Sequence, residues 1–303
     1  MPATPGSTTP APAPDAAPEP FGTRLAQAMD TRGPVCVGID PHAELIRRWG
    51  YPNDAEGLRE FSLRALEALS PHVAAVKPQA AFFERFGSAG VQVLAEVLAQ
   101  ARAAGVVCIL DAKRGDIGST MSAYAQAYLC DGSDLAADAV TLAAYVGYEA
   151  LRPALDAAAR SGRGVFVLGL TSNPEGASVQ HARTAGGATV AAEIARQAAA
   201  DNALAVAGGA RWGHAGLVVG ATVADAIGVT GTELSQFKGP LLAPGLGAQG
   251  ADAAQLADTF GPALPAVLAS ASRSVLRAGP DPRALADAAR ALAADVARAT
   301  GRA

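Results

Sequence analysis

Residues 106–120 read VVCILDAKRGDIGST, an apolar run that passes directly into a cluster of charged side chains. A short and continuous apolar run is typical of a strand covered on both faces, as in a parallel sheet flanked by helices. The following GDIGST has the glycine and hydroxyl residues of a turn that leads into a helix. The stretch therefore predicts one strand–turn–helix unit with charges where the strand ends.

The same pattern recurs along the chain. With residues 106–111, the predicted strands are 35–40, 74–79, 138–144, 164–170, 216–222, 239–245 and 265–271. Amphipathic stretches lie between or after them, at 58–69, 91–105 and 281–299, the last with Asp281 as N-cap and Pro282 at the first helical position. This alternation predicts an α/β fold, a (β/α)₈ TIM barrel that spans residues 21–303 as a single domain. A doubly wound open sheet is the alternative.

Composition limits the partners. Half of the 303 residues are hydrophobic, 17% are charged and the formal net charge is −4, without a basic block, so no nucleic acid partner is expected. No apolar run reaches the length of about 18 residues that a membrane span needs, so no membrane association is expected. Residues 1–20, rich in Pro, Ala and Thr, are expected to form a disordered tail and lack the pattern of a signal peptide.

The cysteines and histidines point away from a metal site. Cys36, Cys108 and Cys130 form no C-x-x-C pair, and we expect reduced thiols buried in the core, which fits a cytoplasmic protein. The four histidines are far apart and show none of the spacings of histidine metal ligands.

Charged side chains gather at the predicted strand ends. Residues two apart on a strand point the same way, so Asp111 and Lys113 are expected to share the mouth of the barrel, within reach of Lys77 from the preceding strand. Asp116 falls in the loop beyond, before the next helix. Opposite charges within about 4–6 Å favour protonated lysines. A rigidly held ammonium can stabilise a carbanion and deliver a proton to it. The alternative is a solvated ladder of surface ion pairs.

The loop after the seventh predicted strand, GLGAQG (245–250), suggests a phosphate site. Its G-x-G-x-x-G spacing is also that of dinucleotide-binding loops, but those open the first strand–helix unit and are followed by an acidic residue. In barrels, the loops after strands seven and eight often bind phosphate through backbone N–H groups. Arg273 could add a bidentate contact and Gln249 could reach over the ligand. A plain tight turn is the alternative.

These motifs together resemble one family. DAKRGDIGST (111–120) has the D-x-K-x-x-D pattern of the orotidine 5′-phosphate decarboxylases. Five further stretches are similar to the longer bacterial branch, type 2, of that family: VGIDPH (37–42), KPQAAFFERFG (77–87), TSNPEG (171–176), VVGAT (218–222) and PGLGAQGAD (244–252). The matches follow one another in order from the first strand to the last.

The resemblance implies an enzyme that converts orotidine 5′-monophosphate to UMP and CO₂, the last step of pyrimidine synthesis, without cofactor or metal. By motif position, Lys113 would protonate C6 and Asp111 would lie against the departing carboxylate. Lys77 and Asp40 would hold the ribose hydroxyls and complete the charged array. The residues that would contact the pyrimidine or frame the base and phosphate are Ser172, Pro244, Gln249 and Arg273.

The resemblance also implies a homodimer, with Asp116, Ile117 and Thr120 donated across the interface to the partner's site. One departure concerns the fourth strand, where the family has an Asn-Pro or Ser-Pro pair before a tyrosine. Here Ala143 and Ala144 precede Tyr145, which puts in doubt a polar role at this strand end.

Two rival functions stay open. A metal-dependent sugar-phosphate decarboxylase or aldol-type synthase can carry the same D-x-K-x-x-D pattern, but it needs a carboxylate pair for Mg²⁺, and the second predicted strand, where PQAAFFE follows Lys77, lacks a candidate acid. A nucleotide-binding sensor barrel would bind UMP without turning over its precursor.

Overall fold

Eight parallel strands close into a barrel in chain order, so that the last strand pairs with the first. The architecture is that of a computed structural model, which describes residues 18–247 and 253–301. The strands are β1 (Val35–Ile39), β2 (Ala75–Pro78), β3 (Val107–Arg114), β4 (Ala139–Leu142), β5 (Gly164–Leu170), β6 (Ala215–Val219), β7 (Leu241–Pro244) and β8 (Val267–Ala271). The predicted (β/α)₈ barrel is confirmed.

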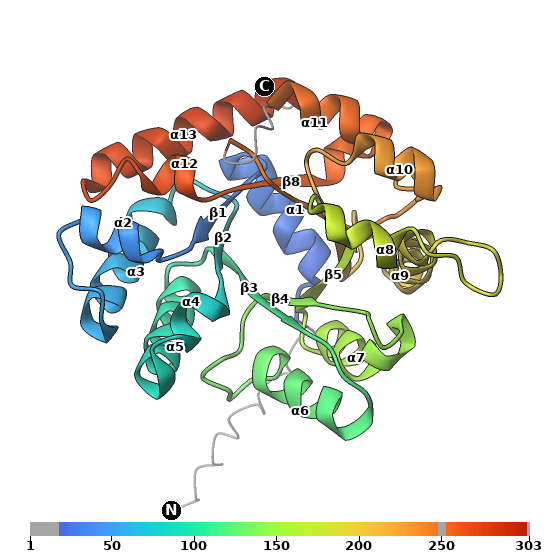
Figure 1. Ribbon diagram of the computed structural model, residues 1–303, viewed down its shortest axis with the longest axis horizontal. Coiled ribbons are helices and arrows are strands. Elements are labelled where there is room, and N and C mark those ends of the chain that lie inside the picture. The colour runs from blue at the N-terminus through green and yellow to red at the C-terminus, as the bar shows by residue number, and fades with distance from the viewer. Residues whose placement is uncertain (1–17, 248–252, 302–303) are drawn as a thin grey trace, which may run out of the picture.

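Helices surround the barrel (Figure 1). They are α1 (Phe21–Arg32), α2 (Ala43–Arg48), α3 (Ala55–Leu69), α4 (Ala80–Glu84), α5 (Gly87–Ala103), α6 (Gly118–Leu129), α7 (Arg152–Arg160), α8 (Ala177–Gln180), α9 (Val190–Ala207), α10 (Ala224–Thr230), α11 (Ala253–Phe260), α12 (Arg273–Leu276) and α13 (Pro282–Ala299). Short 3₁₀ turns lie at η1 (Tyr148–Leu151), η2 (Pro174–Gly176) and η3 (Gly261–Ala266).

Helix ends follow the capping residues. Asp281 caps α13 by accepting hydrogen bonds from the backbone N–H groups of Arg283 and Ala284, as the sequence predicted. Helix α3 begins at Ala55, before the predicted residue 58, because the Asp54 side chain accepts the N–H of Gly57.

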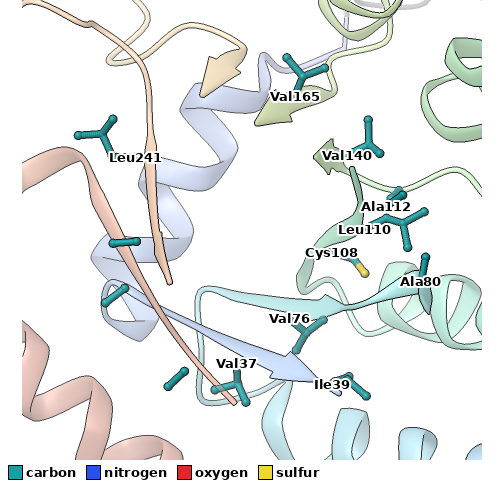
Figure 2. Close-up of a cluster of buried hydrophobic side chains, with 14 of the residues drawn as sticks. Val37, Ile39, Val76, Ala80, Cys108, Leu110, Ala112, Val140, Val165 and Leu241 are labelled. Carbon is teal, nitrogen blue, oxygen red and sulfur yellow. The ribbon is translucent and has the colours of Figure 1, made fainter. Parts of the chain in front are cut away.

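The strands separate two apolar layers because successive side chains point to opposite faces. Outward-facing side chains pack under the helices, as Figure 2 shows for Val37, Ile39, Val76, Leu110 and Val140. The alternate residues fill the inside of the barrel, and they include Cys36, Ile109, Phe166, Leu242 and Leu268. This double burial explains why the strand sequences are nearly continuous in apolar residues.

Helix α1 closes the N-terminal end of the barrel, behind the strands in Figure 1. Its fully buried Phe21 and Leu25 join the inner layer, and the Phe21 ring meets Phe166 edge-on at a centroid distance of 6.0 Å. Apolar packing thus fills this end, which leaves polar groups to the opposite end, at the C-terminal ends of the strands.

Three further expectations from the sequence concern the N-terminal tail, the cysteines and membrane-spanning helices. Most of the predicted tail, residues 1–17, lies outside them. All three cysteines are free, and Cys36 and Cys108 are buried as expected, whereas Cys130 is only half-buried after α6. Within residues 18–247 and 253–301, no helix is both long and apolar enough to cross a membrane.

Candidate active site

A cavity of about 730 Å³ opens at the C-terminal ends of the strands. It brings together seven of the predicted site residues: Asp40, Lys77, Asp111, Lys113, Ser172, Pro244 and Arg273. These residues come from β1, β2, β3, the end of β5, β7 and the end of β8, so the barrel closure itself assembles the site.

A larger hollow, of about 870 Å³, lies outside the barrel against α3 and α5. Its charged residues form peripheral pairs such as Arg59 with Glu96, where Nε lies 2.7 Å from the carboxylate. The strand-end cavity differs because its ion pairs centre on a buried carboxylate, that of Asp111, and we take it as the candidate active site.

Asp111 is the centre of a buried ionic network. Its Oδ2 accepts a hydrogen bond from Lys77 Nζ at 3.1 Å, and its Oδ1 accepts one from Lys113 Nζ at 2.6 Å. The side chains of Lys77 and Asp111 are 8% and 10% exposed, whereas that of Lys113 is 44% exposed. Lys77 is thus a fixed partner inside the barrel, and Lys113 extends from the carboxylate toward the open cavity.

The network determines the charge of its buried members. Burial alone would lower the pKa of Lys77, but the nearby charges of Asp111 and Asp40 outweigh it and raise that pKa above its ordinary value. Burial would raise the pKa of Asp111, but Lys77 and Lys113, together with hydrogen bonds from Lys113 and Thr141, hold it well below its usual range. Asp111 therefore stays an anion and Lys77 a cation at neutral pH.

An irregularity in β3 positions Lys113. The pairing of β3 with β4 shifts between Leu110 and Arg114, which face Val140 and Leu142, so four steps along β3 oppose two along β4. Lys113 lies in this bulge with a φ of 48°, in the left-handed region that side chains other than glycine rarely adopt. Such a backbone costs on the order of 1–3 kcal/mol and is found most often at functional sites.

The turn after Lys113 passes close to β4. A Cβ atom on Gly115 would lie 2.1 Å from the carbonyl oxygen of Ala143, so only glycine fits there. Arg114 anchors the same turn on its other side by pairing with Glu84 of α4. The segment that carries the second aspartate of the motif is therefore held tightly at its start.

Two buried oxygens at the junction of β1 and β8 have no hydrogen-bond partner among the described residues: Asp40 Oδ1 and Ser272 Oγ. They lie beside Gly38, whose added Cβ would come within 2.8 Å of Asp40 Oδ2 and 2.9 Å of Ser272 Cβ. Both residues line the cavity. Since a buried polar atom without a partner costs about 1–3 kcal/mol, these oxygens are suited to a ligand with hydroxyl groups.

The described residues include only part of the predicted phosphate-binding end of the cavity. Pro244 and Gly245 after β7 and Arg273 after β8 line one cavity wall, and the Arg273 side chain is in no ion pair with the described residues. Gln249 lies outside the described residues.

Three predicted site residues do not line this cavity of their own chain. Asp116 accepts the N–H of Ile117 at 2.8 Å, while Ile117 is 62% exposed and Thr120 is exposed on α6. Beyond the end of β4, Tyr145 is 83% and Val146 50% exposed. Large apolar side chains with this exposure on neighbouring turns mark a surface suited to a protein partner.

Thr141 is a site residue that the sequence analysis missed. It lies at the end of β4, is 1% exposed, and donates a hydrogen bond from Oγ1 to Asp111 Oδ1 at 2.8 Å. The sequence analysis doubted a polar role at this strand end because Ala143 and Ala144 are apolar. That doubt was wrong, because Thr141, two residues before Ala143, supplies a hydroxyl there. A threonine inside an apolar run was the signal, but its hydrogen-bond partners depend on the bulge in β3.

Gln180 is a second residue that was missed. Its side-chain amide accepts the N–H of Thr171 and donates to the Thr171 hydroxyl, which ties α8 across the end of β5. Gln180 and Val179 thereby form part of the cavity wall. Within the described residues, no three His, Cys, Asp or Glu side chains are grouped as metal ligands would be.

Comparisons with known proteins agree on one family. The profile of the "Orotidine 5'-phosphate decarboxylase / HUMPS family" matches residues 33–289. A relative from Salinispora arenicola named orotidine 5′-phosphate decarboxylase is 57% identical over 277 residues, which are 91% of this chain and 97% of the relative.

Two solved structures extend this similarity. A crystal structure from Streptomyces avermitilis, provisionally named orotidine 5′-phosphate decarboxylase, has a TM-score of 0.89 at 53% identity and covers 94% of this chain and 98% of its own. The Leishmania donovani OMP decarboxylase has a TM-score of 0.71 at 30% identity, with coverage of 93% and 99%.

The ionic network predicts an unusual pH dependence of stability when its anion is removed. In the wild type, Asp111 contributes stability above its unfolded pKa of about 3.9, and Lys77 contributes below its unfolded pKa of about 10.4, so their contribution is constant near neutral pH. In Asp111→Asn, Asp40 is the main charge left to oppose burial, so we expect the pKa of Lys77 to fall below its unfolded value. We expect a loss of about 3–5 kcal/mol at pH 7 that partly recovers as the pH rises toward 9.5.

Urea unfolding between pH 6 and 9.5 measures this effect. Asp138→Asn is the matched control, because Asp138 is a partly buried carboxylate that pairs with an arginine, Arg24, and not with a lysine. Equal pH profiles for the two variants would contradict the prediction.

Proposed function

The chain belongs to the orotidine 5′-phosphate decarboxylase / HUMPS family, and we propose that it converts orotidine 5′-monophosphate to UMP and CO₂ as the last step of pyrimidine synthesis, with Lys113 as the proton donor and without a cofactor. The observation that carries this proposal is the buried Lys77–Asp111–Lys113 network at the mouth of the barrel. The reaction needs a positive group where a carbanion forms, and this network supplies one.

The proposed chemistry balances without an electron acceptor. The bond between C6 and the carboxylate breaks, its electron pair stays on C6, and CO₂ leaves. Lys113 Nζ then gives a proton to C6, becomes neutral, and regains a proton from solvent through its exposed side. A fixed ammonium beside the developing charge stabilises the transition state more than the ground state, which lowers the barrier.

Asp111 has two parts in this proposal. Its carboxylate aims the Lys113 ammonium through the 2.6 Å hydrogen bond. Because its pKa is held low by the two lysines, it also stays anionic when a substrate carboxylate lies beside it. The repulsion between the two carboxylates is relieved as CO₂ leaves, so it favours the forward step.

The rest of the cavity suits a nucleotide. Asp40 and Lys77 would hold the ribose hydroxyls, which gives the unpartnered Asp40 Oδ1 a donor. Ser172 would contact the pyrimidine, and Pro244, Gln249 and Arg273 would frame the base and phosphate. Binding energy from the phosphate can then be used to hold C6 against Lys113.

We also propose that the active form is a homodimer. Support comes from the position of Asp116, which lies outside the cavity of its own chain, and from the exposed Ile117, Tyr145 and Val146 on the adjacent turns. A second copy that covers this apolar surface would receive Asp116, Ile117 and Thr120 beside its own cavity. We propose a cytoplasmic location as well, and the free thiols of Cys36, Cys108 and Cys130 support it, because thiols stay reduced in that compartment.

The function is tested by following the loss of orotidine 5′-monophosphate absorbance with EDTA present. We expect rapid loss with the wild type and a rate at least about 10³-fold lower for Lys113→Ala, which lacks both the proton donor and the charge. Lys238→Ala is the matched control. Like Lys113, Lys238 has a left-handed backbone conformation, with a φ of 58°, but it does not line the cavity. A metal-dependent enzyme would lose activity in EDTA, and a sensor would bind UMP without turnover; either result would refute the proposal.

The shared site is tested by mixing inactive variants. Lys113→Ala and Asp116→Ala subunits, mixed and allowed to exchange, should form hybrid dimers with one intact site each, which restores about a quarter of the wild-type activity if subunits pair at random. Lys113→Ala mixed with Lys77→Ala should restore none, because both lysines belong to the same chain's cavity. Absence of recovery in the first mixture, with exchange verified by mass spectrometry, would contradict donation of Asp116 across the interface.

A further inference from the structure

Two hydrogen bonds meet at the hydroxyl of Thr141. It donates to Asp111 Oδ1 at 2.8 Å and accepts the backbone N–H of Lys113 at 2.9 Å. A threonine hydroxyl has one proton and two lone pairs, so both bonds can form at once. Among the described residues, Thr141 is thereby the side chain that hydrogen-bonds to both the Asp111 carboxylate and the Lys113 backbone.

The bond to Lys113 takes the place of a strand hydrogen bond. In the bulge between Leu110 and Arg114, the regular pairing of β3 with β4 is interrupted, and it resumes where Ala143 N donates to Arg114 O at 2.8 Å. The N–H of Lys113 lies within the interruption and uses the Thr141 hydroxyl as its acceptor. The same residue has the left-handed φ of 48°, so this hydrogen bond holds a backbone that would otherwise relax.

The bond to Asp111 fixes the second half of the network. Lys77 binds Oδ2, whereas Oδ1 is shared between Lys113 and Thr141. The Lys113 side chain is 44% exposed, while Thr141 is 1% exposed and β-branched, with a restricted rotamer. Thr141 is thus the rigid donor that sets the plane of the carboxylate toward Lys113.

We propose that Thr141 is a positioning residue that holds the Lys113 backbone and the Asp111 carboxylate in one fixed relation, so that the ammonium is aimed at the reacting carbon. Its effect on catalysis rests on the proposed decarboxylase function. Its effect on the geometry of Lys113 and Asp111 is independent of that function, because this effect follows from the hydrogen bonds of the protein without substrate.

Two substitutions separate the hydroxyl from the shape of the side chain. Thr141→Val keeps the volume and branching but removes both hydrogen bonds, and Thr141→Ser keeps the hydroxyl and removes a methyl group. Since a displacement of about 1 Å can cost a factor of about 100, we expect kcat to fall about 100-fold in Thr141→Val with KM changed by less than about threefold. Thr141→Ser should stay within about fivefold of the wild type in both constants.

Thr230→Val is the control for the loss of a buried hydroxyl. Thr230 is 4% exposed in α10, donates to the Ala226 carbonyl at 2.7 Å and contacts the Thr232 hydroxyl at 2.7 Å, without lining the cavity. We expect it to lower the melting temperature as Thr141→Val does, with an unchanged kcat. Titration with UMP gives the concentration of folded sites, to which each kcat is normalised.

Crystal structures of the wild type and Thr141→Val test the geometry without reference to turnover. We expect Lys113 to leave the left-handed region in Thr141→Val and its Nζ to lose the 2.6 Å contact with Asp111 Oδ1. An unmoved Lys113 would overturn the inference, as would a wild-type kcat in Thr141→Val or a Thr141→Ser variant as slow as Thr141→Val. If the wild type does not consume orotidine 5′-monophosphate, the proposed function fails, and the crystal structures still decide the role of Thr141.

Discussion

The site depends on one constraint: a carboxylate buried inside a barrel must be matched by positive charge. Asp111 is 10% exposed at its side chain and satisfies this constraint with two lysines, Lys77 at 3.1 Å and Lys113 at 2.6 Å. Removing charges from water is costly, so the arrangement persists only with short contacts and further hydrogen bonds. The same contacts that offset this cost also fix an ammonium in the cavity, and this is the group that the proposed reaction requires.

The two ends of the barrel differ in polarity, and this difference allows the arrangement. Helix α1 closes the N-terminal end with apolar side chains such as Phe21 and Leu25, so polar groups inside the barrel gather toward the other end. There the bulge in β3 carries Lys113 beyond Asp111, and the glycine at 115 lets the chain turn away against Ala143. Strain at Lys113 is thus balanced by packing and by hydrogen bonds from the neighbouring strand.

Much of this was predictable from the sequence because the responsible signals are local. Continuous apolar runs gave eight strands at nearly the observed bounds, and the spacing of two between Asp111 and Lys113 predicted their shared direction. Thr141 escaped prediction because its role depends on a register shift between two strands, which no local pattern encodes. The sequence placed Asp116 in the turn after the strand, but its donation to a partner's site was implied mainly by resemblance, since a single chain does not indicate what covers its exposed turns.

The central claim is that Lys113, held by Asp111, delivers the proton to C6. By microscopic reversibility, the same lysine should remove that proton from UMP, so the most direct measurement is exchange of the C6 hydrogen of UMP in D₂O, followed by ¹H NMR. The account predicts exchange in the wild type above the rate without enzyme, and none above that rate in Lys113→Ala, whose binding of UMP is verified separately. Equal exchange in both proteins would contradict it and would assign the proton to another group.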